Sequence, residues 1–317
     1  MTKKDFIRKV AAITGVTQNN INEIMSAFRE VAIKALAEED EGDFILSADA
    51  FYKGYRVLKG TSAEINQAME EMNLGDWNTN EYLLIQNSDD GSEREMRFDG
   101  RQFVALKLPP SKYIKAKNAL QRCALDILMN PEITVAAILG GYGTGKTRLA
   151  MSMALYHVRE KGNQAAILGV REPTGEGQDI GYLPGTAEDK TNYFFAPLTQ
   201  QLDGGEFELE GLKQRGVIDT MIPRFMKGMT YNETIIVCDE AEDFSKSVLR
   251  LVGTRVGRNG RIFLAGDYKQ SLTDRSLSNP LLMMCNAFKG DPRFGCIYME
   301  EDVRSDTSKM FADLFQN

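Results

Sequence analysis

From residue 111 onward, short apolar runs alternate with longer segments in which apolar residues recur at the period of a helix. The short runs have the length of buried strands, whereas the longer ones predict amphipathic helices. Buried strands alternating with helices are typical of a parallel sheet covered by helices on both faces. Residues 111–317 therefore predict one α/β domain. The expected strands are 134–139, 164–170, 234–238 and 261–265, and the expected helices include 116–129 and 146–160.

The first 41 residues follow a purely helical pattern. Apolar residues share one helical face over residues 6–13 and again over residues 21–36. Thr2 and Thr17 stand where helix N-caps are expected. This opening resembles the helical half of HU-type histone-like proteins, although the β-arm with which that family grips DNA does not follow. A generic amphipathic helical hairpin used for packing or dimerisation explains the same pattern.

Residues 42–110 predict a linker and a small β module in front of the α/β domain. Asp99-Gly100 suits the turn between two strands, and Leu108-Pro109-Pro110 marks the passage to the following domain. The expected elements are an extended piece at 51–55, a helix near 63–72 and strands at 80–85, 95–99 and 102–106.

Composition narrows the classes of protein further. Of the 317 residues, 43% are hydrophobic and 26% are charged, which excludes wholesale disorder. The net charge of -7 argues against coating nucleic acid by bulk charge. The single histidine, His157, excludes chemistry that needs two, and the four cysteines lack zinc-site spacing. Without a signal-peptide pattern or a membrane-length apolar run, we expect a cytoplasmic protein with no membrane partner.

A glycine-rich segment between the expected strand 134–139 and the helix after it carries the first chemical signal. Residues 140–147, Gly-Gly-Tyr-Gly-Thr-Gly-Lys-Thr, match the phosphate-loop pattern and stand in its strand-to-helix context. Backbone N–H groups in such a loop bind phosphate oxygens at the positive end of a helix. The pattern predicts ATP and Mg²⁺ as cofactors, with Lys146 on the β- and γ-phosphates and Thr147 on the metal. The expected nucleotide-binding residues also include Gly141, Tyr142, Gly143, Thr144, Gly145 and Arg148.

The apolar run 234–238 ends in Asp239-Glu240, which supplies the partner signal. Ligands of open α/β sheets bind at the carboxyl ends of the strands, where Asp239 would hold Mg²⁺ through water. Glu240 would polarise the attacking water. An apolar run followed by Asp-Glu is also a common strand end, but downstream of a phosphate loop it favours an ATPase over a kinase.

Further motifs make the chain resemble the PhoH-like ATPase family, relatives of superfamily 1 helicases, over residues 78–310. The resemblance implies a P-loop NTPase (RecA-like) parallel sheet flanked by helices. It also implies single-stranded nucleic acid as the partner, RNA ahead of DNA, and a homo-oligomer for which a hexameric ring is one arrangement. The motifs are Arg171-Glu172-Pro173, Gly181-Tyr182-Leu183-Pro184-Gly185, Lys190, Pro197-Leu198, Asp239-Glu240-Ala241, Thr254-Arg255-Val256-Gly257, Gly266-Asp267-Tyr268-Lys269-Gln270 and Val303-Arg304-Ser305.

The same resemblance implies roles for four more residues. Gln121 corresponds to the glutamine that reads adenine, and Gln270 to the sensor of the γ-phosphate. Arg304 corresponds to an arginine that supplies positive charge at the phosphates. Arg255 is a second candidate for that role, across a subunit interface. Either arginine is alternatively a partner in a structural ion pair.

Two departures from the family pattern bear on nucleic-acid coupling. The usual DEAQN reads Asp239-Glu240-Ala241-Glu242-Asp243 here, with a carboxylate in place of an amide. The usual Arg-Gly-Arg reads Lys227-Gly228-Met229, with one charge fewer. In one branch of the family a PIN nuclease domain precedes the ATPase, but the first 75 residues leave no room for it, so we expect no nuclease activity.

Basic residues gather beside the expected ATP site despite the acidic total. Residues 244–275 hold seven basic and two acidic side chains. This stretch predicts either an edge that contacts phosphates of a nucleic acid or an ordinary solvated surface. The leading hypothesis is Mg²⁺-dependent ATP hydrolysis coupled to binding or remodelling of single-stranded nucleic acid. The alternative is a nucleotide-dependent oligomeric interaction protein without motor activity.

Overall fold

The computed structural model describes residues 51–172, 202 and 204–300. The predicted N-terminal helical hairpin lies outside the described residues. So do Arg304, Lys190 and the motif residues 173–185. The division of the chain at residues 41 and 110 therefore stays a prediction.

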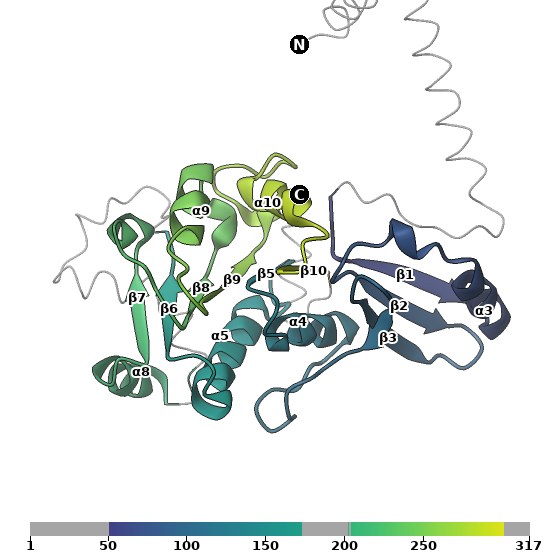
Figure 1. Cartoon of the computed structure of the whole chain (residues 1–317), viewed down its shortest axis with the longest axis horizontal. Coiled ribbons are helices and arrows are strands. Elements are labelled where there is room, and N and C mark those ends of the chain that lie inside the picture. The colour runs from purple at the N-terminus through teal and green to yellow at the C-terminus, as the bar shows by residue number, and fades with distance from the viewer. Residues whose placement is uncertain (1–50, 173–201, 203, 301–317) are drawn as a thin grey trace, which may run out of the picture. The chain divides into compact units, whose positions relative to one another are not determined.

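The α/β domain is built on a six-stranded sheet (Figure 1). All five strand pairings are parallel, and the strand order is β10-β5-β9-β8-β6-β7. The predicted parallel α/β sheet is thus confirmed, and it is consistent with a P-loop NTPase fold. Its strands are β5 (Val135–Gly140), β6 (Ala166–Val170), β7 (Ile218–Met221), β8 (Thr234–Cys238), β9 (Arg261–Gly266) and β10 (Phe294–Met299).

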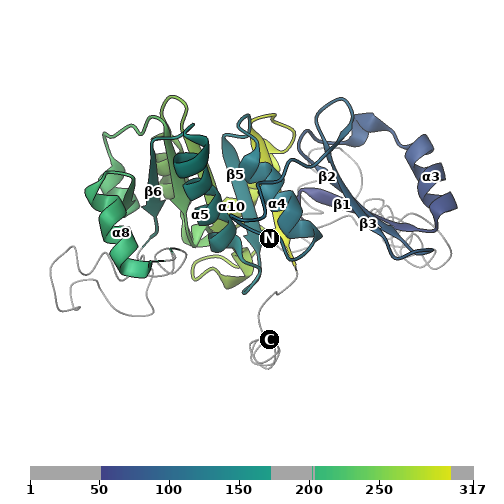
Figure 2. The same cartoon turned by 90° about the horizontal axis from the view of Figure 1, so that it is seen from below.

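Side chains alternate across this sheet into two apolar layers. In β8, Ile235 and Val237 pack with α4 (Ala119–Met129), α5 (Lys146–Tyr156) and α8 (Gly205–Gln214). Ile236 and Cys238 face the opposite layer, with α9 (Lys246–Gly253) and α10 (Pro280–Phe288) (Figure 2). Both faces of the strands are therefore buried, which is why the strand sequences are continuously apolar.

A smaller, four-stranded sheet precedes the large one along the chain, with strand order β1-β2-β3-β4. Its β1–β2 pair is parallel and the other two pairs are antiparallel. Thr61 caps its helix in a capping box with Glu64, which satisfies two backbone N–H groups at the helix start. Its elements are β1 (Tyr55–Gly60), α3 (Ser62–Glu71), the 3₁₀ turn η1 (Leu74–Asp76), β2 (Tyr82–Asn87), β3 (Glu93–Phe98) and β4 (Phe103–Ala105).

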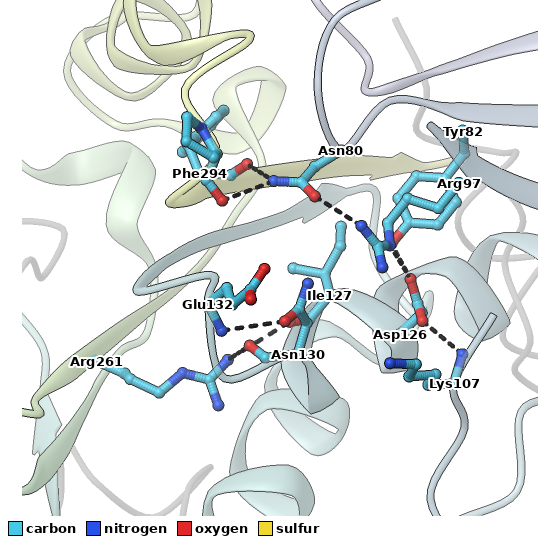
Figure 3. Close-up of polar contacts among 11 residues, drawn as sticks. Asn80, Tyr82, Arg97, Lys107, Asp126, Ile127, Asn130, Glu132, Arg261 and Phe294 are labelled. Carbon is cyan, nitrogen blue, oxygen red and sulfur yellow. Dashed lines mark hydrogen bonds and ion pairs between the residues drawn. The ribbon is translucent and has the colours of Figure 1, made fainter. Parts of the chain in front are cut away.

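A buried polar network joins the small sheet to helix α4 (Figure 3). The Arg97 guanidinium donates to Asp126 at 2.8 Å and to Asn80 at 3.0 Å. Asp126 also accepts from the Tyr82 hydroxyl at 2.7 Å and from the Lys107 backbone N–H at 2.6 Å. Each buried charge thus has both an ion-pair partner and further hydrogen bonds, the condition for burying charges without a large penalty.

Several elements differ from the sequence expectation. Strands β7 and β10 and helices α8 and α10 were not expected. Helix α5 ends at Tyr156 and continues as a π-helical turn over His157–Lys161. The remaining irregular turns are η4 (Pro223–Met226), η5 (Ala241–Asp243) and η6 (Tyr268–Gln270). Among the described helices, none combines the length and apolarity needed to cross a bilayer.

Candidate nucleotide site

The phosphate loop runs from the end of β5 to the first residue of α5. Gly145 has a φ of 91°, in the left-handed region that glycine adopts without strain, and it directly precedes helix α5. The Lys146 ammonium donates to the carbonyls of Gly140 at 2.6 Å and Gly141 at 2.9 Å. Burial lowers the pKa of Lys146, while the nearby charges of Asp267 and Glu242 oppose that shift. The loop therefore directs a cation and a helix N-terminus at the same point, the arrangement that binds phosphates.

Two predicted metal ligands, 92 residues apart, meet at the mouth of this loop. The Thr147 hydroxyl donates to Asp239 Oδ1 at 2.7 Å. The other oxygen of Asp239 lies 3.3 Å from Arg171 Nη1. Burial raises the pKa of Asp239, and the hydrogen bond from Thr147 and the charge of Arg171 oppose the rise.

The oxygens of this pair fit Mg²⁺ by chemistry and by number. A hydroxyl and a carboxylate are hard ligands, and Mg²⁺ in nucleotide enzymes takes one or two protein oxygens together with phosphates and water. Within residues 51–172 and 204–300, no cluster of three or more metal-ligating side chains exists. A self-sufficient protein cage is therefore absent from the described part, and Thr147 with Asp239 would hold the ion only beside a bound nucleotide.

Glu240 follows Asp239 in an unusual backbone conformation. Its φ of 51° and ψ of 44° lie in the left-handed region, which costs a residue with a Cβ some strain. Its side chain is 40% exposed and lies 3.4 Å from Arg171 Nη2. The strained turn thus holds a solvent-accessible carboxylate next to the predicted metal ligands, where a base that polarises water is needed.

Glu242 is the most deeply buried carboxyl of this region, only 1% exposed. Its Oε2 has no hydrogen-bond partner within the described residues. Burial, followed by the neighbouring charge of Glu240, raises the pKa of Glu242 to about 9. Sequence comparison with the family pattern marked this position as a departure without giving it a role. Asp239 and Glu240 stand just before it in the sequence, so no local pattern signalled its burial.

Gln270 lies in the turn η6 at the end of β9, the strand between β5 and β8. Its amide donates to Asp267 Oδ2 at 2.6 Å. Asp267 is buried, and of the charges that raise the pKa of Lys146 its contribution is the largest. The predicted γ-phosphate sensor is thus hydrogen-bonded to a carboxylate whose charge raises the pKa of Lys146.

Gln121 contacts the phosphate loop from helix α4. Its amide nitrogen donates to the Thr144 carbonyl at 2.8 Å, and its oxygen accepts from the Lys117 N–H at 2.8 Å. The side chain is 5% exposed, and a Cβ at Gly145 would lie 3.2 Å from the amide nitrogen. In this structure Gln121 supports the loop from behind. Reading of adenine by Gln121 stays a prediction.

The remaining predicted site residues occupy the rim or lie elsewhere. Tyr142 is 63% exposed at the tip of the loop, and Arg148 is exposed in the first turn of α5. Arg255 donates to the Met229 carbonyl at 3.1 Å and to the Thr254 hydroxyl at 3.3 Å. No ion pair of Arg255 occurs within the described residues, so its contacts there do not favour the structural ion-pair alternative.

Comparison with known proteins agrees with this geometry. The family model described as "PhoH-like protein" matches residues 113–316. The chain is similar to the protein PhoH2 of Bacillus subtilis, with 27% identity over 89% of this chain and 69% of that protein. It is also similar to PhoH2 of Thermobispora bispora, with 29% identity over 64% of this chain and 48% of that protein.

A solved structure, the helicase domain of Hef from Pyrococcus furiosus, shares 16% identity and a TM-score of 0.32. That likeness covers 56% of this chain and 38% of the Hef chain and is too low to add to the argument. The family match covers most of the α/β domain, whereas this chain spans only about half of the second PhoH2 relative.

Proposed function

The chain belongs to the PhoH-like protein family, and on that premise we propose that it hydrolyses ATP with Mg²⁺ and couples this to single-stranded nucleic acid. The observation that carries the proposal is the 2.7 Å bond between Thr147 and Asp239 at the mouth of the phosphate loop. A phosphate loop without a carboxylate beside its Thr would bind phosphate but lack a metal position.

Each residue of the site has a distinct task in the proposed reaction. Lys146 neutralises charge on the transferring phosphoryl group, and Thr147 with Asp239 holds Mg²⁺, which when bound withdraws charge from the β- and γ-phosphates. Glu240 accepts a hydrogen bond from the attacking water and orients it toward the phosphorus. The amide of Gln270 donates to a γ-phosphate oxygen.

The hydrolysis part of the proposal is tested by release of inorganic phosphate from ATP. We expect release that requires Mg²⁺ and stops when EDTA removes it. Phosphate that appears on an added small-molecule acceptor instead of in solution would contradict hydrolysis and indicate a kinase. No release under any condition would contradict the enzymatic activity itself.

The nucleic-acid part rests on exposed basic and aromatic side chains that follow the carboxyl ends of β7 and β8. Lys246 and Arg250 are exposed on one face of α9. Arg224 stacks 5.1 Å over the ring of Phe225, which is 60% exposed in the turn η4. Cations that contact phosphates beside an exposed ring that stacks on bases are the usual elements of single-strand binding.

One basic residue of the stretch 244–275, Arg261, is buried and does not contribute to the surface. Arg261 is 3% exposed and donates to the carbonyls of Ile133 and Asn130 at 3.0 and 2.9 Å. Its Nη1 lies 3.0 Å from His157 Nε2, and burial lowers the pKa of Arg261 to about 10. Arg261 is thus a structural residue at the C-terminal end of α4, where carbonyls favour a cation.

The nucleic-acid proposal is tested with a double variant, Lys246→Ala with Arg250→Ala, measured for binding of single-stranded RNA and DNA against salt. Loss of two phosphate contacts should flatten the slope of log affinity against log salt by about 1.4, at roughly 0.7 per contact. A matched control removes two exposed cations from the small sheet, Lys59→Ala with Arg94→Ala. Equal slopes in the two double variants would contradict the assigned surface.

RNA or DNA should also accelerate phosphate release in the wild-type chain. Turnover that no polynucleotide changes at any salt concentration would favour the nucleotide-dependent interaction protein instead. The proposed homo-oligomer, with a hexameric ring as one arrangement, is tested by mass measurement with and without ATP.

A further inference from the structure

The four residues Phe51–Gly54, here called the lead-in segment, lie against the edge strand β10. The Tyr298 N–H donates to the Lys53 carbonyl at 2.9 Å, and the Tyr52 N–H donates to Asn286 Oδ1 at 3.0 Å. Gly54 has a φ of 83°, and a Cβ there would lie 1.8 Å from the Cys296 carbonyl oxygen. Only glycine permits this approach, so the backbone of the lead-in segment is fixed to the sheet edge.

Phe51 extends this contact to the nucleotide site. Its ring packs edge-to-face on Tyr268 with centroids 5.3 Å apart, and on Tyr298 with centroids 5.1 Å apart. The ring centroids of Tyr268 and Tyr298 lie 6.5 Å from each other. Edge-to-face pairs at these distances have the favourable geometry of aromatic contacts.

Tyr268 is the first residue of η6, the turn that ends at Gln270. The turn consists of three residues, and the Asp267 carboxylate before it accepts from the Lys269 N–H at 3.1 Å and from the Gln270 amide at 2.6 Å. Lys269 and Gln270 thus share the Asp267 carboxylate, and the Ser271 N–H donates to the Tyr268 carbonyl at 3.2 Å, so hydrogen bonds tie the two ends of this short turn together. Fixing the Tyr268 ring therefore fixes the Gln270 amide.

We propose that Phe51 is a positioning residue, whose ring clamps Tyr268 and so holds the Gln270 amide in register with the γ-phosphate. The inference rests on the proposed ATP hydrolysis and deepens it. Phe51 acts through the ring of Tyr268, which it contacts.

A purely structural role of Phe51 would have different consequences. Loss of simple packing lowers the stability of the fold and weakens the binding of all ligands to the same extent. Loss of a clamp on Gln270 affects only steps that involve the γ-phosphate, because ADP has no group in contact with the sensor. The discriminating measurement is thus the ratio of the affinities for a non-hydrolysable ATP analogue and for ADP, beside kcat and KM.

The test uses the full chain with Phe51→Ala, with Phe51→Tyr as the conservative variant and Phe288→Ala as matched control. Phe288 forms a comparable edge-to-face pair with Phe294, at the other end of β10, with centroids 5.8 Å apart. For Phe51→Ala we expect kcat to fall about tenfold, the effect of losing the aromatic pair with Tyr268. The preference for the ATP analogue over ADP should fall by a similar factor, with ADP affinity unchanged. Phe51→Tyr should restore both, and Phe288→Ala should match the wild type.

Two results would overturn the inference. One is a Phe51→Ala protein with wild-type kcat and wild-type preference for the ATP analogue. The other is equal loss of ADP and analogue affinity, which would make the contact merely structural. If the wild type released no phosphate, the proposed hydrolysis would fail, while the affinity ratio would still decide the role of Phe51.

Discussion

Two buried polar regions of this chain contain similar side chains but differ in how fully those side chains are satisfied. In the network between the small sheet and α4, Asp126 accepts from Arg97, Tyr82 and the Lys107 N–H. In the nucleotide site, Lys146 donates only to backbone carbonyls in the hydrogen bonds of the described residues, and Glu242 Oε2 has no partner there.

The difference separates structural charges from charges that await a ligand. A buried charge costs several kcal/mol when unpaired, so a fully paired network stabilises one arrangement and offers nothing to a ligand. An incompletely paired region retains binding capacity, because an incoming phosphate supplies further acceptors for the Lys146 ammonium. The incompletely paired groups suit the proposed nucleotide site, whereas the fully paired Asp126 network stabilises the fold.

The largest expected effect comes from removing the phosphate-loop cation. Lys146→Ala should lower ATP turnover by about 10³-fold or more, because no other cation of the loop replaces its charge on the phosphates. Its melting temperature should stay at or above the wild-type value, because the substitution removes a poorly solvated charge. Phosphate release measures the turnover, and calorimetry measures the melting temperature. A large loss of stability would contradict the distinction between the two regions.

For the Asp126 network we expect the reverse: a large loss of stability with turnover retained. Arg97→Met leaves the Asp126 carboxylate buried without its ion-pair partner, and should cost about 3–5 kcal/mol of unfolding free energy. In a chain of this size that lowers the melting temperature by roughly 10 °C. Turnover measured well below the melting point should remain. Arg293→Met is the control, because Arg293 is 72% exposed in its pair with Asp291 and should matter little.

Within the nucleotide site, Glu240→Gln separates binding from hydrolysis. The amide keeps the size of the side chain but accepts a proton poorly, so turnover should fall by about 10²-fold. Binding of ATP with Mg²⁺ should persist, since Lys146, Thr147 and Asp239 are unchanged. Titration calorimetry beside a turnover assay measures both, and wild-type turnover would rule out the assigned role.

The smallest effect concerns stability and pH. The unfolded Glu242 carboxyl ionises near its ordinary pKa of about 4.3. Its folded pKa is about 9. The folded state therefore holds the proton longer, and between these two values a rise in pH removes stability. Glu242→Gln abolishes this loss, so its gain over the wild type should be larger at pH 8 than at pH 5, by about 1 kcal/mol or more. Melting curves at the two pH values check it, and parallel curves would contradict the burial argument.

Sequence patterns anticipated the contact between Thr147 and Asp239 better than some of the elements around it. The meeting of Thr147 with Asp239 followed from two local motifs, because a phosphate loop and a strand-end carboxylate have fixed places in a parallel sheet. Strands β7 and β10 were missed: β7 has only four residues, and a glycine interrupts β10. Neither has the long apolar run that identified β5 and β8.

Tertiary contacts determine the burial of the residues whose position the sequence did not predict. Arg261 looked like a surface cation because a charge count ignores burial, whereas the C-terminal end of α4 and His157 enclose it. Glu242 follows a charged pair in the sequence, yet the chain turns it beneath Gly266, where a Cβ would lie 2.5 Å from Glu242 Oε2. No local pattern reports such enclosure, since it depends on residues far along the chain.

The most direct test of this account is the shift in melting temperature that ATP with Mg²⁺ causes in three proteins: wild type, Arg97→Met and Lys146→Ala. A ligand at about 100 times its Kd stabilises the folded state by about 2.7 kcal/mol. We predict the same stabilisation in the wild type and in Arg97→Met, whatever their starting stabilities, and none in Lys146→Ala. An equal shift in Lys146→Ala, or no shift in the wild type, would contradict the claim that the incompletely paired region is the nucleotide site.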